Sequence, residues 1–228
     1  MVAFVSCFHG RHNVSAVFLQ HCAEIGITGT MFAAVTEGDA GNIELLRRYG
    51  IRYVEHENMP LGAKHNAALR LAIEAGGWSH VMVLPSDDLV SREWVEACGE
   101  HEYGTAPSAA MIDPDGMRAK LLVAKPGGRM KFGACRVFSR NVVDALCGAI
   151  WHDHHRRGLD RSSDARIRAA GFALTVGAVR GPAFVDVKGP ESLWGYGTWD
   201  GDAISVEDAL WMCSEGVRNR LVSMHAAQ

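Results

Sequence analysis

The first 90 residues alternate short apolar runs with amphipathic stretches, and this alternation limits the folds that the chain can adopt. The apolar runs have the length of strands and lie at 2–8, 31–35, 51–54 and 81–84, and helical patterns lie between them at 15–25, 43–49 and 61–75. Strands that alternate with helices are joined by crossover connections, so the pattern predicts βαβ units and a parallel sheet. The N-terminal half is therefore expected to be a Rossmann-type α/β layer.

The regularity fades beyond residue 91, and the second half is expected to be mixed. Two strands are predicted at 107–112 and 119–124, because the strong turn signal Asp113-Pro-Asp-Gly separates them. Helices are predicted at 92–98, 139–150, 160–170 and 203–214. Without a low-complexity linker, a repeat or a break in composition, we expect one α/β domain over residues 1–228.

Composition indicates a soluble globular protein with a real core. Of the 228 residues, 48% are hydrophobic and 21% are charged. No apolar stretch approaches the ~18 residues of a membrane span, and the N-terminus lacks a basic region before its short apolar run. We therefore expect an untargeted, cytoplasmic protein without a membrane span.

The six cysteines lie far apart and form no CxxC pair, which argues against a zinc ribbon or a disulfide framework. Reduced and mostly buried thiols are expected instead.

Charge is unevenly distributed. The net charge of −3 excludes a polybasic protein, yet residues 116–168 contain 12 Lys and Arg against 4 Asp and Glu. This segment is either a solvated basic face or a site for a polyanion.

The residues that follow the strands are the place to look for chemistry, because ligands of open α/β sheets bind beyond the carboxyl ends of the strands. The sharpest signal is Pro85-Ser-Asp-Asp88, after the fourth strand. Two adjacent carboxylates repel each other unless a cation or donors neutralise them, and hard divalent ions prefer such ligands. Asp87 and Asp88 thus indicate a metal site, unless they form a solvated turn in which Asp88 caps the 92–98 helix.

Several motifs, taken in order, resemble those of the GT-A glycosyltransferases, particularly compact relatives of family 2, over roughly residues 1–195. The motifs are the Leu61-Gly-Ala-Lys-His-Asn helix, the Val81–Asp88 strand end, the Lys131-Phe-Gly-Ala-Cys-Arg segment and the helix from Gly158-Leu-Asp-Arg to Ala-Ala-Gly171. The resemblance implies a single GT-A-like domain that transfers a sugar, with inversion, from a nucleoside diphosphate, for which a UDP-sugar is expected. It also implies a divalent Mn²⁺ or Mg²⁺ on the diphosphate and a carboxylate that deprotonates the acceptor hydroxyl.

By this resemblance, Asp88 is the metal-binding end of the family's DxD signature and Asp87 is its partner at the ribose. The chain has Pro85 where many relatives have the first Asp. Near the C-terminus, Asp186 corresponds to a final metal ligand. Lys188 lies on the same side of an extended chain and would offset charge on the departing diphosphate, unless the two merely pair on a surface strand.

The resemblance also assigns the base. Asp160 corresponds to the family's catalytic carboxylate, although Leu159 replaces the preceding Glu, and Asp164, one helical turn on, is the reserve. The alternative is that Asp160 caps the N-terminus of its helix.

Further residues are expected to contact the donor. Ser6 and Arg11 follow the first strand, and Glu37 and Asp39 follow the second as contacts to a base or ribose. Lys64 and Asn66 open a helix whose amides could face a phosphate. In the aromatic loop of Trp194, Tyr196 and Trp199, Trp194 and Tyr196 are predicted to form a lid over the donor and acceptor, or else to close the core.

The run His152-Asp-His-His155 contains zinc-ligand residues, but they are contiguous and no HExxH motif is present. A His-rich loop beside the acceptor cleft is the preferred interpretation.

Within the single domain, residues 1–90 are expected to bind the nucleotide, and residues 91–228 to bind the acceptor and supply a C-terminal lid and helix. A saccharide or small-molecule acceptor is favoured over a hydroxymethylated DNA base, although the basic segment would suit a phosphate backbone. Two alternatives stay open: a sugar-nucleotide pyrophosphorylase, for which the expected GxGxR loop is missing, and a nucleotide-sugar-binding pseudoenzyme.

Overall fold

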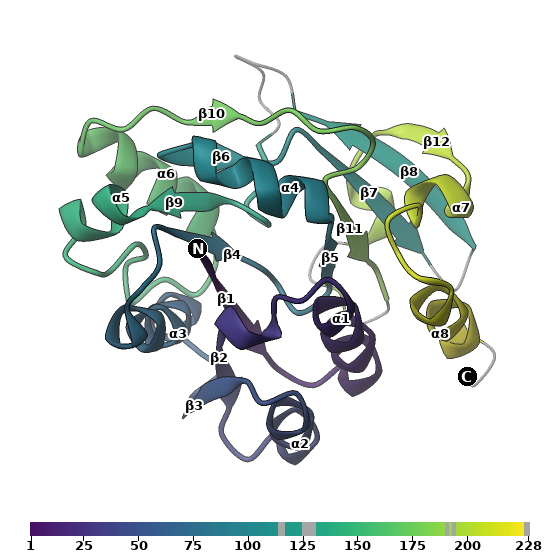
Figure 1. The fold of residues 1–228 in the computed structure, drawn as a ribbon, viewed down its shortest axis with the longest axis horizontal. Coiled ribbons are helices and arrows are strands. Elements are labelled where there is room, and N and C mark those ends of the chain that lie inside the picture. The colour runs from purple at the N-terminus through teal and green to yellow at the C-terminus, as the bar shows by residue number, and fades with distance from the viewer. Residues whose placement is uncertain (114–116, 125–130, 190–191, 193–194, 226–228) are drawn as a thin grey trace.

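The computed structural model describes residues 1–113, 117–124, 131–189, 192 and 195–225 and contains two sheets (Figure 1). The strands of the larger sheet, in spatial order, are β10 (Thr175–Val176), β6 (Tyr103–Thr105), β9 (Val137–Ser139), β4 (His80–Val83), β1 (Val2–Phe8), β2 (Met31–Thr36) and β3 (Arg52–His56). Those of the smaller sheet are β12 (Asp202–Ile204), β8 (Arg118–Val123), β7 (Ser108–Asp113), β11 (Phe184–Val187) and β5 (Asp88–Val90). The helices are α1 (His12–Glu24), α2 (Ala40–Arg48), α3 (Leu61–Ala75), α4 (Arg92–Ala97), α5 (Arg140–Ala145), α6 (Leu159–Ala169), α7 (Val206–Ala209) and α8 (Glu215–His225).

The parallel core β4-β1-β2-β3 confirms the predicted Rossmann-type half. Side chains of β1 alternate between its faces: Phe4 and Phe8 pack in the same apolar cluster as α1, whereas Ala3 and Val5 pack with α3. Helices therefore cover both faces, and both faces of the strand must be apolar.

The chain passes from the first sheet to the second immediately after β4. The strand ends at Val83, the backbone turns through Pro85 to Asp87, and Asp88 opens β5 in the second sheet. Asp88 does not cap the next helix, since Ser91 accepts the Trp94 amide there. The crossing brings Asp88 beside β11, a strand from almost 100 residues further along the chain.

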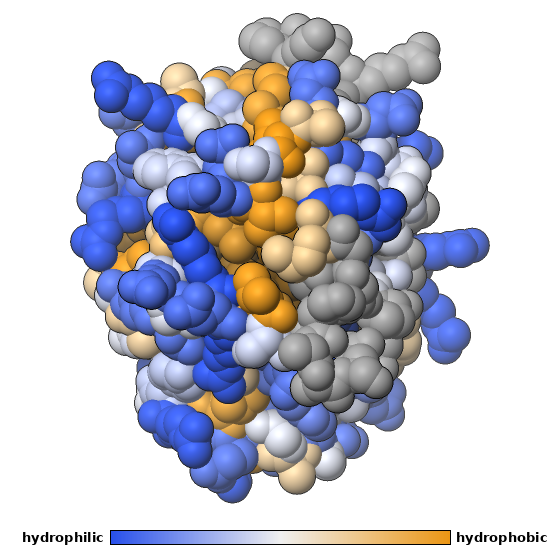
Figure 2. Space-filling view, turned by 90° about the vertical axis from the view of Figure 1, so that its right-hand side faces the viewer, coloured by the Kyte–Doolittle hydropathy of each residue, from blue (hydrophilic) through white to orange (hydrophobic). Residues whose placement is uncertain are grey.

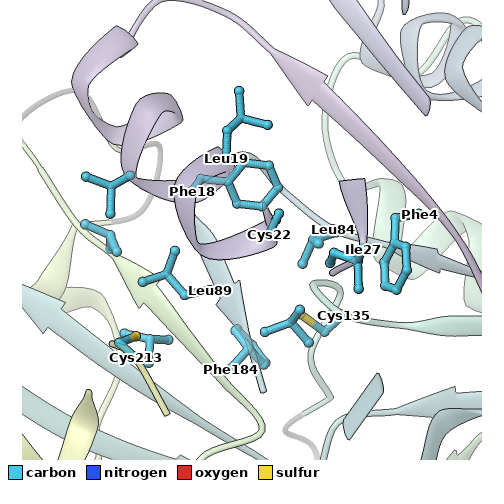
Figure 3. Packing of buried hydrophobic residues seen from close by; sticks show 14 of the residues in the cluster. Phe4, Phe18, Leu19, Cys22, Ile27, Leu84, Leu89, Cys135, Phe184 and Cys213 are labelled. Carbon is cyan, nitrogen blue, oxygen red and sulfur yellow. The ribbon is translucent and has the colours of Figure 1, made fainter. Parts of the chain in front are cut away.

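A shared apolar cluster joins the two sheets. Figure 3 shows Phe18, Leu19 and Cys22 of α1 on one side of this cluster, with Leu89 and Phe184 of the second sheet across from them. All six cysteines are free thiols, and four of them are buried, as predicted.

Two predicted helices differ from the structure. The 139–150 helix ends at Ala145 because Cys147 and Gly148 adopt left-handed backbone conformations. The 203–214 helix is replaced by the edge strand β12 and the short α7, because the Ser205 side chain accepts the Asp208 amide and starts the helix there.

The side of the molecule that carries β8, β12, α7 and α8 has a band of apolar surface between hydrophilic margins (Figure 2). Within the described part of the chain, every helix is too short or too polar to cross a membrane.

Candidate active site

A cavity of about 550 Å³ lies where the turn after β4, the end of β11 and the start of α6 meet. Its polar lining includes Asp87, Asp88, Asp160, Asp186 and Lys188, which come from three separate segments of the chain. The structure thus brings the two predicted metal ligands and the predicted base to one cavity.

Asp88 and Asp186 face each other across two antiparallel strands. They are register partners of β5 and β11, so their side chains leave the sheet on the same face. The Asp88 side chain is buried, and Oδ1 of each carboxyl is buried without a hydrogen-bond partner among the described residues. Buried acceptors are rarely left unpaired, so the two oxygens could accept a group from outside the chain.

Burial and mutual repulsion make the pair costly to ionise. Desolvation raises the pKa of Asp88 well above its usual value, and the charges of Asp186 and Asp87 raise it further. Desolvation and Asp87 likewise raise the pKa of Asp186 to about 6, against the lowering effect of Lys188.

Two cations border the carboxylates. Lys188 Nζ lies 2.6 Å from Asp186 Oδ2. Arg11 Nη1 lies 2.6 Å from Asp87 Oδ2, and its Nη2 donates to the Val187 carbonyl at 2.9 Å. Arg11 thereby ties the loop after β1 to the carboxylate turn and to β11, beside the cavity but outside its lining.

The carboxylate pair fits a hard divalent cation. Two unpaired, partly neutralised oxygens are ligands of the kind that Mg²⁺ and Mn²⁺ take, and these ions commonly complete their shell with substrate phosphates and waters. No group of three or more His, Cys, Asp or Glu side chains gathers in metal-binding geometry among the described residues. Asp88 and Asp186 would therefore hold the ion only together with ligands from the substrate and solvent.

Asp160 presents an exposed carboxyl to the same cavity. It is the second residue of α6, whose N-cap is Gly158, so the alternative that Asp160 caps the helix is wrong. Its backbone carbonyl accepts from Arg136 Nη1 at 3.1 Å and from Ser163 Oγ at 3.2 Å, which fixes the first turn. No described residue donates a hydrogen bond to its carboxylate, so both oxygens are available to a ligand.

Gly133 makes room for this carboxyl. A Cβ at position 133 would lie 2.0 Å from Cγ of Asp160. The sequence analysis did not identify Gly133 as a site residue, because the contact joins two segments that are far apart in sequence.

Asp164, the reserve base of the sequence analysis, lies outside the cavity. Its carboxyl accepts the Tyr103 hydroxyl at 2.9 Å and Nε of Arg168 at 2.9 Å, and it does not line the cavity. These donors lower its pKa, although burial opposes them. Asp164 therefore holds α6 against β6.

Lys64 and Asn66 point into the protein, which corrects their assignment to the donor. Lys64 Nζ donates to the Phe8 carbonyl, Thr36 Oγ1 and Asn58 Oδ1 at 2.7, 2.7 and 3.1 Å, and all three protons of the ammonium are thereby used. The Asn66 amide is buried and bonds to Trp151 and Asp153.

The N-terminus of α3 is also closed to a phosphate. The amides of Gly62 and Ala63 donate to the carbonyls of His155 and Asp153. The His-rich loop thus caps a helix through its backbone. The rings of His152, His154 and His155 lie 4.7 to 5.5 Å apart by their centroids.

The acids after β2 have different environments. Asp39 caps α2, and its carboxylate accepts from the Gly10 amide, His12 and Asn42. Burial tends to raise its pKa, but these hydrogen bonds prevail and lower it to about 2. Asp39 therefore fastens the loop after β1, whereas Glu37 is exposed at the strand end.

Ser6 does not reach the site. Its side chain is buried within β1, outside the cavity lining, because position 6 lies inside the strand rather than after it.

The predicted lid is seen only in part. Trp194 lies outside the described residues. Tyr196 packs its ring beneath Lys120 Nζ, at 4.3 Å, and beside the Arg118 guanidinium, at 5.0 Å from its carbon. Tyr196 thus packs against side chains of β8 and does not line the main cavity. Trp199 lines a second cavity nearby.

His65, which follows Lys64 in the motif of α3, lines the cavity and was missed. Its ring lies 4.9 Å from that of Trp151, and its Nδ1 is buried without a described partner. Desolvation and the charge of Lys64 lower its pKa to about 4, so the imidazole is neutral at pH 7. Only its position beside Lys64 could have drawn attention to it.

Much of the charge in the basic segment is used inside the molecule. Lys120 and Arg136 are buried, and Arg166 Nη1 donates to the Ala149 carbonyl. Arg140 and Arg168 pair with acids one helical turn away. The described part of the segment therefore carries less free positive charge than its composition indicates.

Comparison with protein-family models gave no match, and comparison with curated protein sequences gave none either. Solved structures do match. The TarS 1–349 structure from S. aureus in complex with UDP-GlcNAc is 9% identical, with a TM-score of 0.61, over 99% of this chain and 71% of that one. A second TarS 1–349 structure is 10% identical, with a TM-score of 0.60, over 82% of this chain and 60% of that one.

A 4-diphosphocytidyl-2C-methyl-D-erythritol synthase is 12% identical, with a TM-score of 0.51, over 83% of this chain and 94% of that one. At these identities the likeness is one of fold. The chain has a GT-A-like α/β fold, as the sequence motifs predicted.

Proposed function

We propose that this protein is a metal-dependent, inverting glycosyltransferase that moves a sugar from a nucleoside diphosphate sugar to a hydroxyl acceptor. One observation carries the proposal: the unpaired carboxylate oxygens of Asp88 and Asp186 and the free carboxyl of Asp160 line a single cavity. The first two suit a cation on a diphosphate, and the third suits a proton acceptor. In this proposal residues 1–90 supply most of the donor site and residues 91–228 supply the acceptor side.

The donor class follows from charge and from likeness of fold. Arg11 and Lys188 flank the carboxylate pair, where they can meet phosphate oxygens as well as balance the acids. TarS, whose structure contains UDP-GlcNAc, shares the fold over 99% of this chain. A UDP-sugar is therefore the first donor to test.

The chemistry requires few groups of the chain itself. Asp160 takes the proton of the acceptor hydroxyl while the hydroxyl oxygen attacks the anomeric carbon, and the bond to the diphosphate breaks with its electron pair on the departing phosphate oxygen. Lys188 and Arg11 stabilise the charge that grows there. A divalent ion held by Asp88 and Asp186 would supply Lewis-acid stabilisation of the same oxygens.

Nucleotidyl transfer is the second candidate, because a 4-diphosphocytidyl-2C-methyl-D-erythritol synthase shares the fold. The products separate the two reactions: glycosyl transfer releases a nucleoside diphosphate, whereas nucleotidyl transfer releases pyrophosphate. The accessible carboxyl of Asp160 favours glycosyl transfer, since attack by an alcohol needs a base.

The test is a donor screen with Mn²⁺ or Mg²⁺ that follows nucleoside diphosphate and pyrophosphate separately, first without and then with acceptors. Asp88→Asn is expected to abolish metal-dependent donor binding in calorimetry. Asp160→Asn is expected to keep donor binding and lose about 10²- to 10⁴-fold in kcat. The control Asp144→Asn changes an exposed acid of α5 outside the cavity and leaves both unchanged.

Equal loss of donor binding in the Asp88 and Asp160 variants would contradict the division of roles. Donor binding without turnover on any acceptor or water would indicate the pseudoenzyme instead.

A further inference from the structure

A second cavity, of about 240 Å³, adjoins the first on the side of the smaller sheet. The two cavities share five lining residues: Gly133, Ala134, Asp160, Asp186 and Lys188. Asp160 therefore stands at the junction, where a ligand in the second cavity would present one end to the first.

The walls of this cavity are apolar. Ala109 and Met111 lie two residues apart on β7, so their side chains point to the same face of the strand, and Leu122 comes from β8. The rings of Phe132 and Phe184 pack edge to face, with their centroids 5.4 Å apart. Trp199 lines the cavity as well. The charged lining residues other than Lys131 are all among those shared with the first cavity.

We infer that the acceptor is a compact alcohol whose hydroxyl is carried on an apolar body the size of a single ring, rather than a saccharide. This inference rests on the proposed function and names its acceptor class. The ring would occupy the second cavity, and the hydroxyl would reach Asp160 at the junction, where the proton transfer and bond exchange described above take place.

Two physical arguments support this class over a sugar. A saccharide carries hydroxyl groups on most of its carbons, and those placed against Ala109, Met111 and Leu122 would lose water without gaining hydrogen-bond partners. An apolar ring gains from the same burial. The volume is sufficient, since a cavity of ~150 Å³ lined by apolar side chains binds benzene.

The experiment measures binding separately from transfer. Benzyl alcohol serves as the ring alcohol and methyl glucoside as the saccharide, and ligand-observed NMR with the full chain reports the binding of each without donor. A third probe, 5-hydroxymethyl-2′-deoxyuridine, is used free and within an oligonucleotide, because a hydroxymethylated ring can come from either source. Transfer from the active donor to each probe is then followed by mass spectrometry.

Ala109→Leu fills the cavity from β7, and Leu122→Phe fills it from β8, so that one variant remains informative if the other folds poorly; both positions line the second cavity and not the first. The matched control is Ala170→Leu, an exposed position at the end of α6. Filling is expected to weaken benzyl alcohol binding about tenfold and to leave hydrolysis of the donor by water unchanged, whereas the control binds as the parent protein does.

Transfer to a ring alcohol that both filling variants reduce supports the inference. Turnover on methyl glucoside that is insensitive to filling overturns it and leaves the proposed function standing. If filling weakens benzyl alcohol binding as expected but no donor gives transfer, the proposed function is overturned, and the acceptor assignment with it.

Discussion

The buried acid pair predicts an unusual dependence of stability on pH, which the variant Asp186→Asn tests. The substitution also removes a charge that raises the pKa of Asp88, and this acts in the same direction as the loss of the Asp186 charge itself. The pKa of Asp186 is raised from 3.8 to about 6 in the folded protein. Well below pH 3.8 the carboxyl is protonated in both the folded and the unfolded chain, so its ionisation does not affect the free energy of unfolding. Above pH 6 the folded protein holds a charge that the unfolded chain accommodates more easily.

The size of the effect follows from the pKa difference. At 1.36 kcal/mol per pKa unit, ionised Asp186 lowers the free energy of unfolding by about 3 kcal/mol, and the penalty develops between roughly pH 4 and pH 6. In a chain of this length this corresponds to roughly 6–12 °C in Tm.

The substitution also removes the partner of Lys188, which costs stability. The effect of this ion pair on the pH dependence is already contained in the pKa of Asp186, which Lys188 lowers against desolvation and the charge of Asp87. His65, whose lowered pKa changes stability in the opposite direction, titrates in both proteins and largely cancels in the difference.

The assay is urea unfolding of the parent protein and Asp186→Asn with a chelator present, at intervals from pH 3.5 to 7.5. As pH rises through this range, the free energy of unfolding of the variant is expected to increase by about 3 kcal/mol relative to that of the parent protein. Millimolar Mn²⁺ should stabilise the parent at pH 7 and leave the variant nearly unchanged. A difference that is flat with pH, or that falls, would refute the reasoning.

Three further substitutions test other contacts. Gly133→Ala should displace the Asp160 carboxyl and reduce kcat at least tenfold with little change in Tm, measured by steady-state kinetics and calorimetry. Lys64→Met should destabilise the fold by about 3 kcal/mol in urea unfolding, because one buried and two partly buried acceptors lose their donor, and the affinity for the sugar donor per folded molecule should not change. Asp39→Ala should lower stability by about 1–2 kcal/mol through loss of the α2 cap, and a thermal shift below 2 °C would contradict that role.

The first half of the fold was predictable because its elements are local. The 61–75 helix was predicted with its observed bounds, and the four strands predicted within the first 90 residues lie within two residues of the observed ones, whereas β5 was not predicted. Each of these elements is specified by its own apolar period. The prediction of a helix over 203–214 was wrong because β12 depends on pairing with the edge of β8, which lies about 80 residues earlier in the chain.

The candidate site shows the same division. Asp88 was recognisable as one of two adjacent acids that follow an apolar strand, whereas Asp160 and Asp186 were chosen from the resemblance to family motifs. Lys64 and Asn66 were misassigned because a helix start looks the same whether its polar side chains meet a ligand or the protein's own carbonyls.

By itself, the sequence determined which segments are strands and helices in the parallel half, and which residues have chemistry to offer. The tertiary structure decided which of them meet. The pairing of β5 with β11 sets Asp88 opposite Asp186, and the packing of Asp160 beside Gly133 leaves its carboxyl open. Local periodicity carries no information about contacts between segments almost 100 residues apart, because those contacts are selected by the burial of whole faces.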